Sequence, residues 1–377
     1  MELNPFVFNR PLDPDQLIDR DEEADRLLAL AEGGHTSRLA APRRYGKTSL
    51  LRRVGRDADL AGMSYVEVDF YGVLSLSDVI VRLAGAYGGL RGPLRRIAIA
   101  VLETLKLKVS VGAGPLRVEA RAVEPGGASQ IVSSLLDLPL TMYERNGART
   151  LVAFDEFQAL LAVGDGVDGL FRSRIQRHGD AASYIFAGSH PGLMHELFGR
   201  QERPFFGQAR VFRLEPLAAA DLVEYVGARF ERTGRDATPA LAPLVEFCRG
   251  HPQRAMLLAH HLWEQTPRGE EATPERWRAA LDAVLDEQSE ALESAWDALG
   301  GAERGVVAAL ALATDPLFSE RTLSRFNLSK GGAQHARDKL ARMGSLHKVG
   351  ERWELVDPLL GEWISRLESR VGWGGWR

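Results

Sequence analysis

A lysine and two hydroxyl-bearing residues directly follow a glycine in the segment APRRYGKTSL, residues 41–50. Together with Ala41, the closing triplet Gly46-Lys47-Thr48 gives the looser form of the phosphate-loop signature, which more often opens with glycine. Such a loop needs Gly46 so that main-chain amides can curl round phosphates, Lys47 to bridge the β and γ oxygens, and the Thr48 hydroxyl as a magnesium ligand. The segment therefore predicts a site for ATP and Mg²⁺.

The remaining loop positions are candidate nucleotide ligands as well, namely Pro42, Arg43, Arg44, Tyr45 and Ser49. The two arginines could contact phosphate, and a solvated or ion-paired role is an equal alternative. Residues 37–41 have the apolar character of a short strand, and the residues that follow the loop have helical spacing. A strand, a tight loop and a helix would place the phosphates at a helix amino terminus.

A second candidate segment, TLVAFDEFQAL at residues 150–160, ends an apolar run with two carboxylates. Asp155 and Glu156 would emerge at the carboxyl end of a buried strand, where ligands bind in open α/β sheets. We expect Asp155 to hold magnesium through water and Glu156 to polarise the attacking water. Helix capping is the alternative role for this pair.

Two other polar positions follow apolar runs further along the chain. Ser189, after the run at residues 183–188, is placed to sense the γ-phosphate or to orient the water, and a helix N-cap is the alternative. Gly250 and Pro252 mark the start of a helix. That helix start, or His251 within it, could reach the nucleotide.

The elements that must position these residues are predicted from the hydrophobic pattern. Apolar runs that alternate with helical stretches indicate an α/β fold, a parallel sheet with helices on both faces. Between the second and third runs the sequence predicts inserted helices and a hairpin around residues 109–118. The predicted strands are 36–41, 64–70, 150–155, 183–188 and 211–214, and the inserted helices are 76–90, 94–105 and 131–144.

The length of 377 residues predicts two or three domains. We expect a core at 1–215 with the insertion at about 75–147, a helical lid at 216–293, a winged helix at 294–368 and a tail at 369–377. In the last domain the pattern predicts three helices and then a hairpin that turns at Gly350.

Composition restricts the possible partners. The net charge of −4 means that any DNA binding must come from a local patch, for which Lys330, Arg337, Lys339 and Arg342 on the third helix are candidates. Nearby acidic residues such as Asp338 offset these charges, so protein docking or nucleotide sensing by the winged helix is an equal alternative.

The single cysteine, Cys248, excludes a disulfide framework and lies in an apolar helical run, so we expect it in the core. The amino terminus has no basic segment followed by an apolar one, and no uncharged apolar stretch reaches the roughly 18 residues of a membrane span. We therefore expect a cytoplasmic protein that makes no membrane contact.

The order of the segments APRRYGKTSL, VAFDEF, IFAGSH, RLEPL, GHP and WELVDPLLGEWISRL resembles the archaeal-type ATPases, in the STAND and AAA+ branch of P-loop proteins. The resemblance extends over residues 4–368. It implies a sheet with strands ordered 5-1-4-3-2, a helical lid and a carboxyl-terminal winged helix. The segment IDRDEEADRLLAL resembles the family's helix near adenine, which implies that Arg20 contacts the nucleotide, and the GHP segment implies the same for Pro252.

Two positions depart from the family pattern. The loop opens with Ala41 instead of glycine, and Gln208 stands where the family has arginine before the fifth strand. Arg200, Arg203 and Arg210 are candidates for an arginine finger, with a solvated surface position as the alternative for each, and none is assigned.

These patterns together predict an ATPase that works as a nucleotide-dependent switch with a protein partner. Two alternatives stay open: an initiator-like or regulatory DNA-binding protein controlled by ATP, and a nucleotide-binding scaffold that hydrolyses little.

Overall fold

The structure is a computed structural model that describes residues 2–110, 117–120 and 125–372. The chain divides into two compact units. The core unit comprises Asp13–Ala41 and Lys47–Leu214, and the C-terminal unit comprises Met1–Leu12, Pro42–Gly46 and Glu215–Arg377.

The core unit is built on a parallel five-stranded sheet in the order β2-β5-β6-β1-β7. When these strands are numbered one to five along the chain, the order is 5-1-4-3-2, so the predicted α/β fold and strand order are confirmed. The five predicted strands lie within two residues of the observed ones, which are β1 (Ser37–Ala40), β2 (Ser64–Asp69), β5 (Thr150–Asp155), β6 (Ala182–Gly188) and β7 (Arg210–Arg213).

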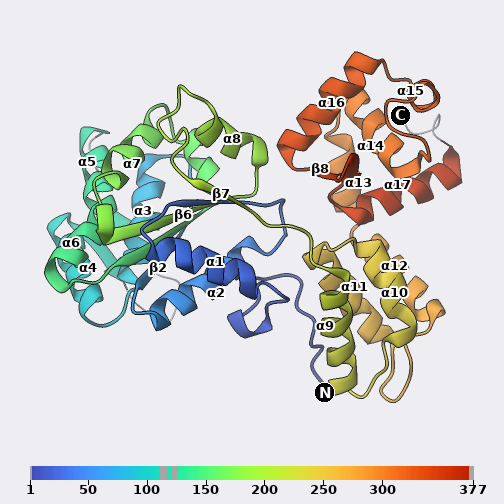
Figure 1. Ribbon diagram of the computed structural model, residues 1–377, viewed down its shortest axis with the longest axis horizontal. Coiled ribbons are helices and arrows are strands. Elements are labelled where there is room, and N and C mark those ends of the chain that lie inside the picture. Colours follow the sequence, from blue (N-terminus) through green and yellow to red (C-terminus); the bar gives the residue numbers. More distant parts are fainter. Residues whose placement is uncertain (1, 111–116, 121–124, 373–377) are drawn as a thin grey trace. The chain divides into compact units, whose positions relative to one another are not determined.

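Helices cover both faces of this sheet (Figure 1). On one face, α1 and α2 contact strands of the sheet, and on the other α3 packs on β2. Buried aromatic rings pack together on that second face, where the ring centroids of Phe157 and Phe186 are 4.5 Å apart. Phe186 lies in β6 and Phe157 lies two residues beyond the end of β5, and both strands end at the same edge of the sheet. The packing of the two rings therefore helps to position the residues at that edge. The helices are α1 (Asp21–Glu32), α2 (Lys47–Leu60), α3 (Leu76–Gly88), α7 (Val167–Ile175) and α8 (Pro191–Gly199).

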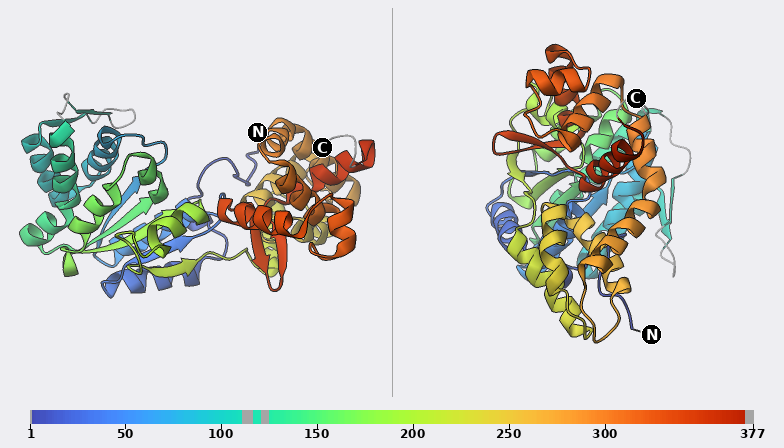
Figure 2. Two further views of the ribbon diagram at one scale, coloured as in Figure 1. Left: turned by 90° about the horizontal axis from the view of Figure 1, so that it is seen from above. Right: turned by 90° about the vertical axis from the view of Figure 1, so that its right-hand side faces the viewer.

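The insertion between β2 and β5 contains the predicted hairpin, whose strands pair antiparallel beside α3 and α4 (Figure 2). Residues 111–116, which include the predicted turn, lie outside the described residues. The single helix predicted at 131–144 is wrong, because two helices meet at Asp137 and Pro139 is the second residue of the second helix. The elements are α4 (Gly92–Thr104), β3 (Leu107–Ser110), β4 (Arg117–Ala120), α5 (Pro125–Leu136) and α6 (Leu138–Asn146).

The C-terminal unit begins with a helical bundle. Cys248 is fully buried in it, as predicted. The bundle helix that starts at Pro252 is capped by His251, whose Nδ1 accepts a hydrogen bond from the main-chain N–H of Arg254 at 3.3 Å. The helices are α9 (Ala219–Arg232), α10 (Thr238–Cys248), α11 (Pro252–Gln265), α12 (Pro274–Glu287) and α13 (Ser289–Asp297).

The same unit ends in the predicted winged helix, with Gly350 at φ +59° in the hairpin turn. Trp296 at the end of α13 is buried in the winged-helix core, so α13 runs across the predicted boundary at residue 294. The elements are α14 (Gly301–Leu312), α15 (Glu320–Arg325), α16 (Lys330–Met343), β8 (Leu346–Val349), β9 (Arg352–Leu355) and α17 (Pro358–Val371). Within the described ranges, none of the helices has the length and apolar character that a membrane span requires.

Candidate functional site

The loop between β1 and α2 has the backbone shape that a phosphate site needs. Arg44 and Gly46 both have left-handed backbone angles, with φ of 66° and 83°. Residues of alternating hand turn successive N–H groups toward one side and form an anion-binding concavity. A Cβ atom on Gly46 would meet no described heavy atom within 4 Å, so the backbone angle is what calls for glycine here. Helix α2 then begins at Lys47, and its first N–H groups have no partners within the helix.

The loop hydroxyl and the first carboxylate lie in contact. Thr48 Oγ1 donates a hydrogen bond of 2.6 Å to Asp155 Oδ2, although the two residues are 107 positions apart. Lys47 and Ser49 flank the threonine and are both buried. The topology explains the contact, because β1 and β5 are parallel and end at the same edge of the sheet.

The surroundings of Asp155 disfavour the ionised form of its carboxyl group. Burial raises its pKa, and the adjacent Glu156 charge acts in the same direction, whereas the Thr48 hydrogen bond and the Lys47 charge act against them. A divalent cation would relieve this. Hydroxyl and carboxylate oxygens are the hard ligands that Mg²⁺ prefers, so these residues fit the ion. The described part of the chain has no group of three or more potential metal-binding side chains, so other ligands would come from phosphate and water.

Glu156 is the first residue after β5. It has a left-handed φ of 49° and its N–H donates to Asp155 Oδ1 at 2.9 Å. The side chain makes no capping bond to the short helix η2 (Phe157–Ala162) that follows. For Glu156, therefore, helix capping is not the role of the side chain.

Ser189 meets Glu156 across the sheet edge. Its Oγ donates to Glu156 Oε2 at 2.7 Å. The N-cap position of α8 belongs to His190, so the alternative role predicted for Ser189 is wrong. The same Glu156 oxygen accepts a hydrogen bond from Gln158 Nε2, a contact that the sequence pattern did not predict. The one feature of the sequence that could have pointed to Gln158 is its position two residues after Glu156.

The first half of the loop packs within the C-terminal unit. Tyr45 is 2% exposed, and its ring lies 5.0 Å from the His251 ring, edge to face. The tyrosine could therefore meet a nucleotide through its main chain only. Burial lowers the pKa of Arg44, and the nearby Arg254 and Arg43 charges act in the same direction, whereas the Asp357 charge acts against them.

Helix α11 connects this region to the winged helix. Arg254 is buried and donates from Nε to Asp357 Oδ1 at 2.9 Å, while Nη2 bonds the other carboxylate oxygen. Asp357 is the N-cap of α17. Burial acts to raise the pKa of Asp357, but the Arg254 hydrogen bonds and charge outweigh it, and the pKa is lowered. Burial also lowers the pKa of His251 to about 4, so this ring is neutral at pH 7.

The other candidates lie in varied surroundings. Arg20 is buried and forms an ion pair with Glu23 at the start of α1, and Pro252 is the first residue of α11. Their nucleotide contacts stay predictions. Among the candidate arginine fingers, Arg203 is paired with Asp168 and Glu196. Gln208 accepts a hydrogen bond from Arg172, and Arg200 and Arg210 are exposed.

Two cations of the candidate DNA-reading helix α16 form ion pairs within the winged helix. Arg337 pairs with Asp338 and lies over the rings of Phe318 and Trp353. Lys339 pairs with Glu303 of α14. These two cations therefore contribute to packing within the domain, and their charges are partly neutralised by their partners.

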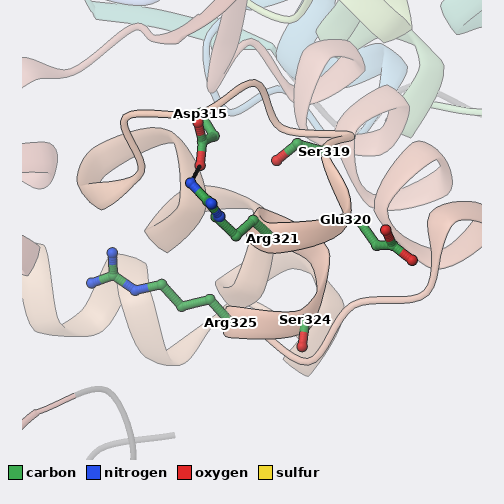
Figure 3. A pocket seen from close by; sticks show the side chains of 6 residues that line it. All are labelled: Asp315, Ser319, Glu320, Arg321, Ser324 and Arg325. Atoms are coloured by element: carbon green, nitrogen blue, oxygen red, sulfur yellow. Dashed lines mark ion pairs between the residues drawn. The ribbon is translucent and has the colours of Figure 1, made fainter.

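A surface pocket at α15 follows the same pattern (Figure 3). Arg321 points to Asp315, with which it forms an ion pair, and Arg325 pairs with Glu368. The lining of the pocket includes two carboxylates and two guanidinium groups, so it has no net charge to attract an ionic ligand.

No protein-family model matches the chain, and no curated protein sequence matches it. Solved structures do. A Walker-type ATPase of Pyrococcus abyssi is similar with a TM-score of 0.69 and 18% identity, over 95% of this chain and 99% of that one. The ORC2 protein of Aeropyrum pernix, solved in ADPNP–ADP complexes, is similar with a TM-score of 0.58 and 16% identity, over 96% and 97% of the two chains. At these identities the likeness establishes a shared fold.

Proposed function

We propose that this protein is an ATPase of the AAA+ and STAND type. The observation that carries the proposal is the meeting of Thr48, Asp155, Glu156 and Ser189 at one edge of the sheet, reached from three separate strand ends. Similarity to a Walker-type ATPase and to a protein solved with ADPNP and ADP supports it.

Nucleotide binding would use the loop and the start of α2. The main-chain N–H groups around Gly46 and the ammonium of Lys47 would hold the phosphates. Thr48 would ligate Mg²⁺ directly and Asp155 through water, and the bound ion would neutralise charge on the β- and γ-phosphates.

Hydrolysis would use the second carboxylate. The oxygen of a water molecule forms a bond to the γ-phosphorus while the bond from that phosphorus to the bridging oxygen breaks, and ADP leaves with the electron pair. Glu156 orients the water and accepts its proton, which then passes to the phosphate product. Ser189 orients Glu156 through the hydrogen bond to Oε2.

The test of hydrolysis is phosphate release by the wild-type chain and by Glu156→Gln. The amide keeps the shape of the side chain but cannot take a proton, so turnover should fall by about 10² to 10⁴ while ATP still binds. Glu202 is an exposed glutamate in the same unit, so Glu202→Gln serves as the matched control. This variant should hydrolyse ATP at the wild-type rate. Retained binding with no wild-type turnover would favour the scaffold alternative.

We further propose that the nucleotide controls the winged helix as a switch for a protein partner. The supporting contacts run from Tyr45 of the loop to His251, and from Arg254 on the same helix to Asp357. A ligand shifts a conformational equilibrium only if it binds one state more tightly, and here the loop that holds the phosphates also packs on α11.

The switch is tested by hydrogen exchange in residues 294–368 with and without ATP. We expect a difference between the two states in wild type that persists in Glu156→Gln and vanishes in Lys47→Ala. Identical exchange in every sample would contradict the switch. DNA binding is not proposed, because the pairing of Arg337 and Lys339 speaks against a reading face on α16.

A further inference from the structure

Gln158 is a buried polar residue that the proposed reaction does not yet use. It lies in η2, two residues after Glu156, and is 6% exposed. Its Nε2 donates to Glu156 Oε2, the oxygen that also accepts from Ser189 at 2.7 Å. Two donors from different segments therefore hold one oxygen of the proposed base. No hydrogen bond within the described ranges reaches the other oxygen, Oε1.

The orientation of the Gln158 amide follows from its partner. An ionised carboxylate only accepts hydrogen bonds, so the NH₂ group must face Glu156 and the amide oxygen must point away. That oxygen, Oε1 of Gln158, is buried and finds no donor in the part of the chain that the structure describes. A methionine or leucine would fill the same space with no unpaired acceptor, so packing alone does not account for glutamine here.

The neighbouring strand makes room for this amide. Gly188 ends β6, and a methyl group on it would overlap Gln158 Oε1 and lie 2.6 Å from the Met194 sulfur. The absence of a side chain at residue 188 thus lets Gln158 reach Glu156 beside Ser189.

Resting on the function proposed above, we propose that Gln158 is a positioning residue for ATP hydrolysis. It fixes the Glu156 carboxylate through Oε2 and leaves Oε1 to take the proton of the attacking water. Without its donor, Glu156 would be held by Ser189 alone and would spend less time in the productive orientation. Gln158 therefore acts on the chemical step and not on nucleotide affinity.

The test uses Gln158→Met and Gln158→Leu in the full chain, with Gln334→Met on the exposed side of α16 as a matched control. We expect kcat to fall roughly tenfold in both Gln158 variants, with KM and the dissociation constant for ATP within about twofold of wild type. Thermal unfolding of each variant identifies any loss of folding, and the second variant keeps the test valid if one fails to fold. A tenfold rise in KM at unchanged kcat would overturn the proposal, since the residue would then act on binding.

A double-mutant cycle separates a positioning role from a structural one. If Gln158 acts through the base, Gln158→Met should cost nothing further in Glu156→Gln. An equal loss in both backgrounds would overturn the proposal, and so would a faster variant, which would mean that Gln158 restrains Glu156 away from the water.

The outcomes also distinguish this inference from the function on which it rests. Wild-type turnover equal to that of Glu156→Gln would contradict the function itself. A large loss in Glu156→Gln, with both Gln158 variants at wild-type rate, would contradict the inference alone.

Discussion

The carboxyl edge of the core sheet and helix α16 of the winged helix both concentrate polar side chains, but they use them differently. At the sheet edge the polar groups contact one another, as Thr48 does with Asp155 and Ser189 with Glu156. On α16 the cations contact neighbouring parts of their own domain, as Lys339 does with Glu303. Charge on a surface thus indicates a ligand only when structural partners have not already neutralised it.

If ion pairs in the C-terminal unit hold its parts together, the pair of the buried Arg254 and the half-buried Asp357 should matter most. Asp357→Asn keeps an N-cap acceptor for α17 but leaves the arginine charge buried without a carboxylate. We expect the free energy of unfolding in urea to fall by about 2 to 4 kcal/mol. Glu354→Gln is the control, because its partner Arg249 is exposed, and it should cost less than about 1 kcal/mol. Equal costs would contradict the distinction between the two pairs.

Two buried histidines, one in each unit, extend the comparison to pH. Burial lowers the pKa of His178 and of His251 to about 4, from an ordinary value near 6.5. The folded chain binds fewer protons than the unfolded one, so each contribution is complete above about pH 6.5 and is lost as the pH falls toward 4. Acidification from pH 7 to pH 5 should therefore lower the free energy of unfolding by roughly 2 kcal/mol for each ring.

Denaturant titrations of wild type and His178→Gln at both pH values test this. The variant should lose less stability on acidification than wild type does, because it has one titrating group fewer. The same pH dependence in the two proteins would mean that folding does not lower the pKa of His178.

The smallest effect is expected for DNA. No ion pair among the described residues involves Lys330 or Arg342, so α16 has these two cations available for phosphates. We expect duplex binding by the full chain to have a slope of log K against log salt no steeper than about −2. A much steeper slope, reduced by Lys339→Ala, would show that the ion pairs open and that α16 reads DNA after all.

The sequence contained enough to predict most of the sheet edge. Continuous apolar runs marked the strands, and parallel strands bring their carboxyl ends together, so Asp155 and Thr48 could be expected to meet. Gln158 could not be predicted in this way. Its contact depends on the left-handed Glu156 and the tight turn of η2, and neither has a periodic signature.

Charges posed the opposite difficulty. Lys339 reads as part of a basic helix face, because its partner Glu303 is 36 positions away. Tyr45 lies in a ligand-binding motif, but its side chain is buried against His251, a contact between segments far apart in the chain. Such tertiary partners decide whether a polar residue is available, and no local pattern encodes them.

The most direct test of the central claim, that the edge around the phosphate loop binds ATP, is the stabilisation of the chain by Mg²⁺-ATP. At about a hundred times its dissociation constant the nucleotide should raise the free energy of unfolding of wild type by roughly 2.7 kcal/mol. Lys47→Ala should abolish the increase at the same ATP concentration, because the bridge to the β and γ oxygens is lost, and Lys330→Ala on α16 should leave it intact. An equal increase in Lys47→Ala and wild type, or no increase in wild type, would contradict the account.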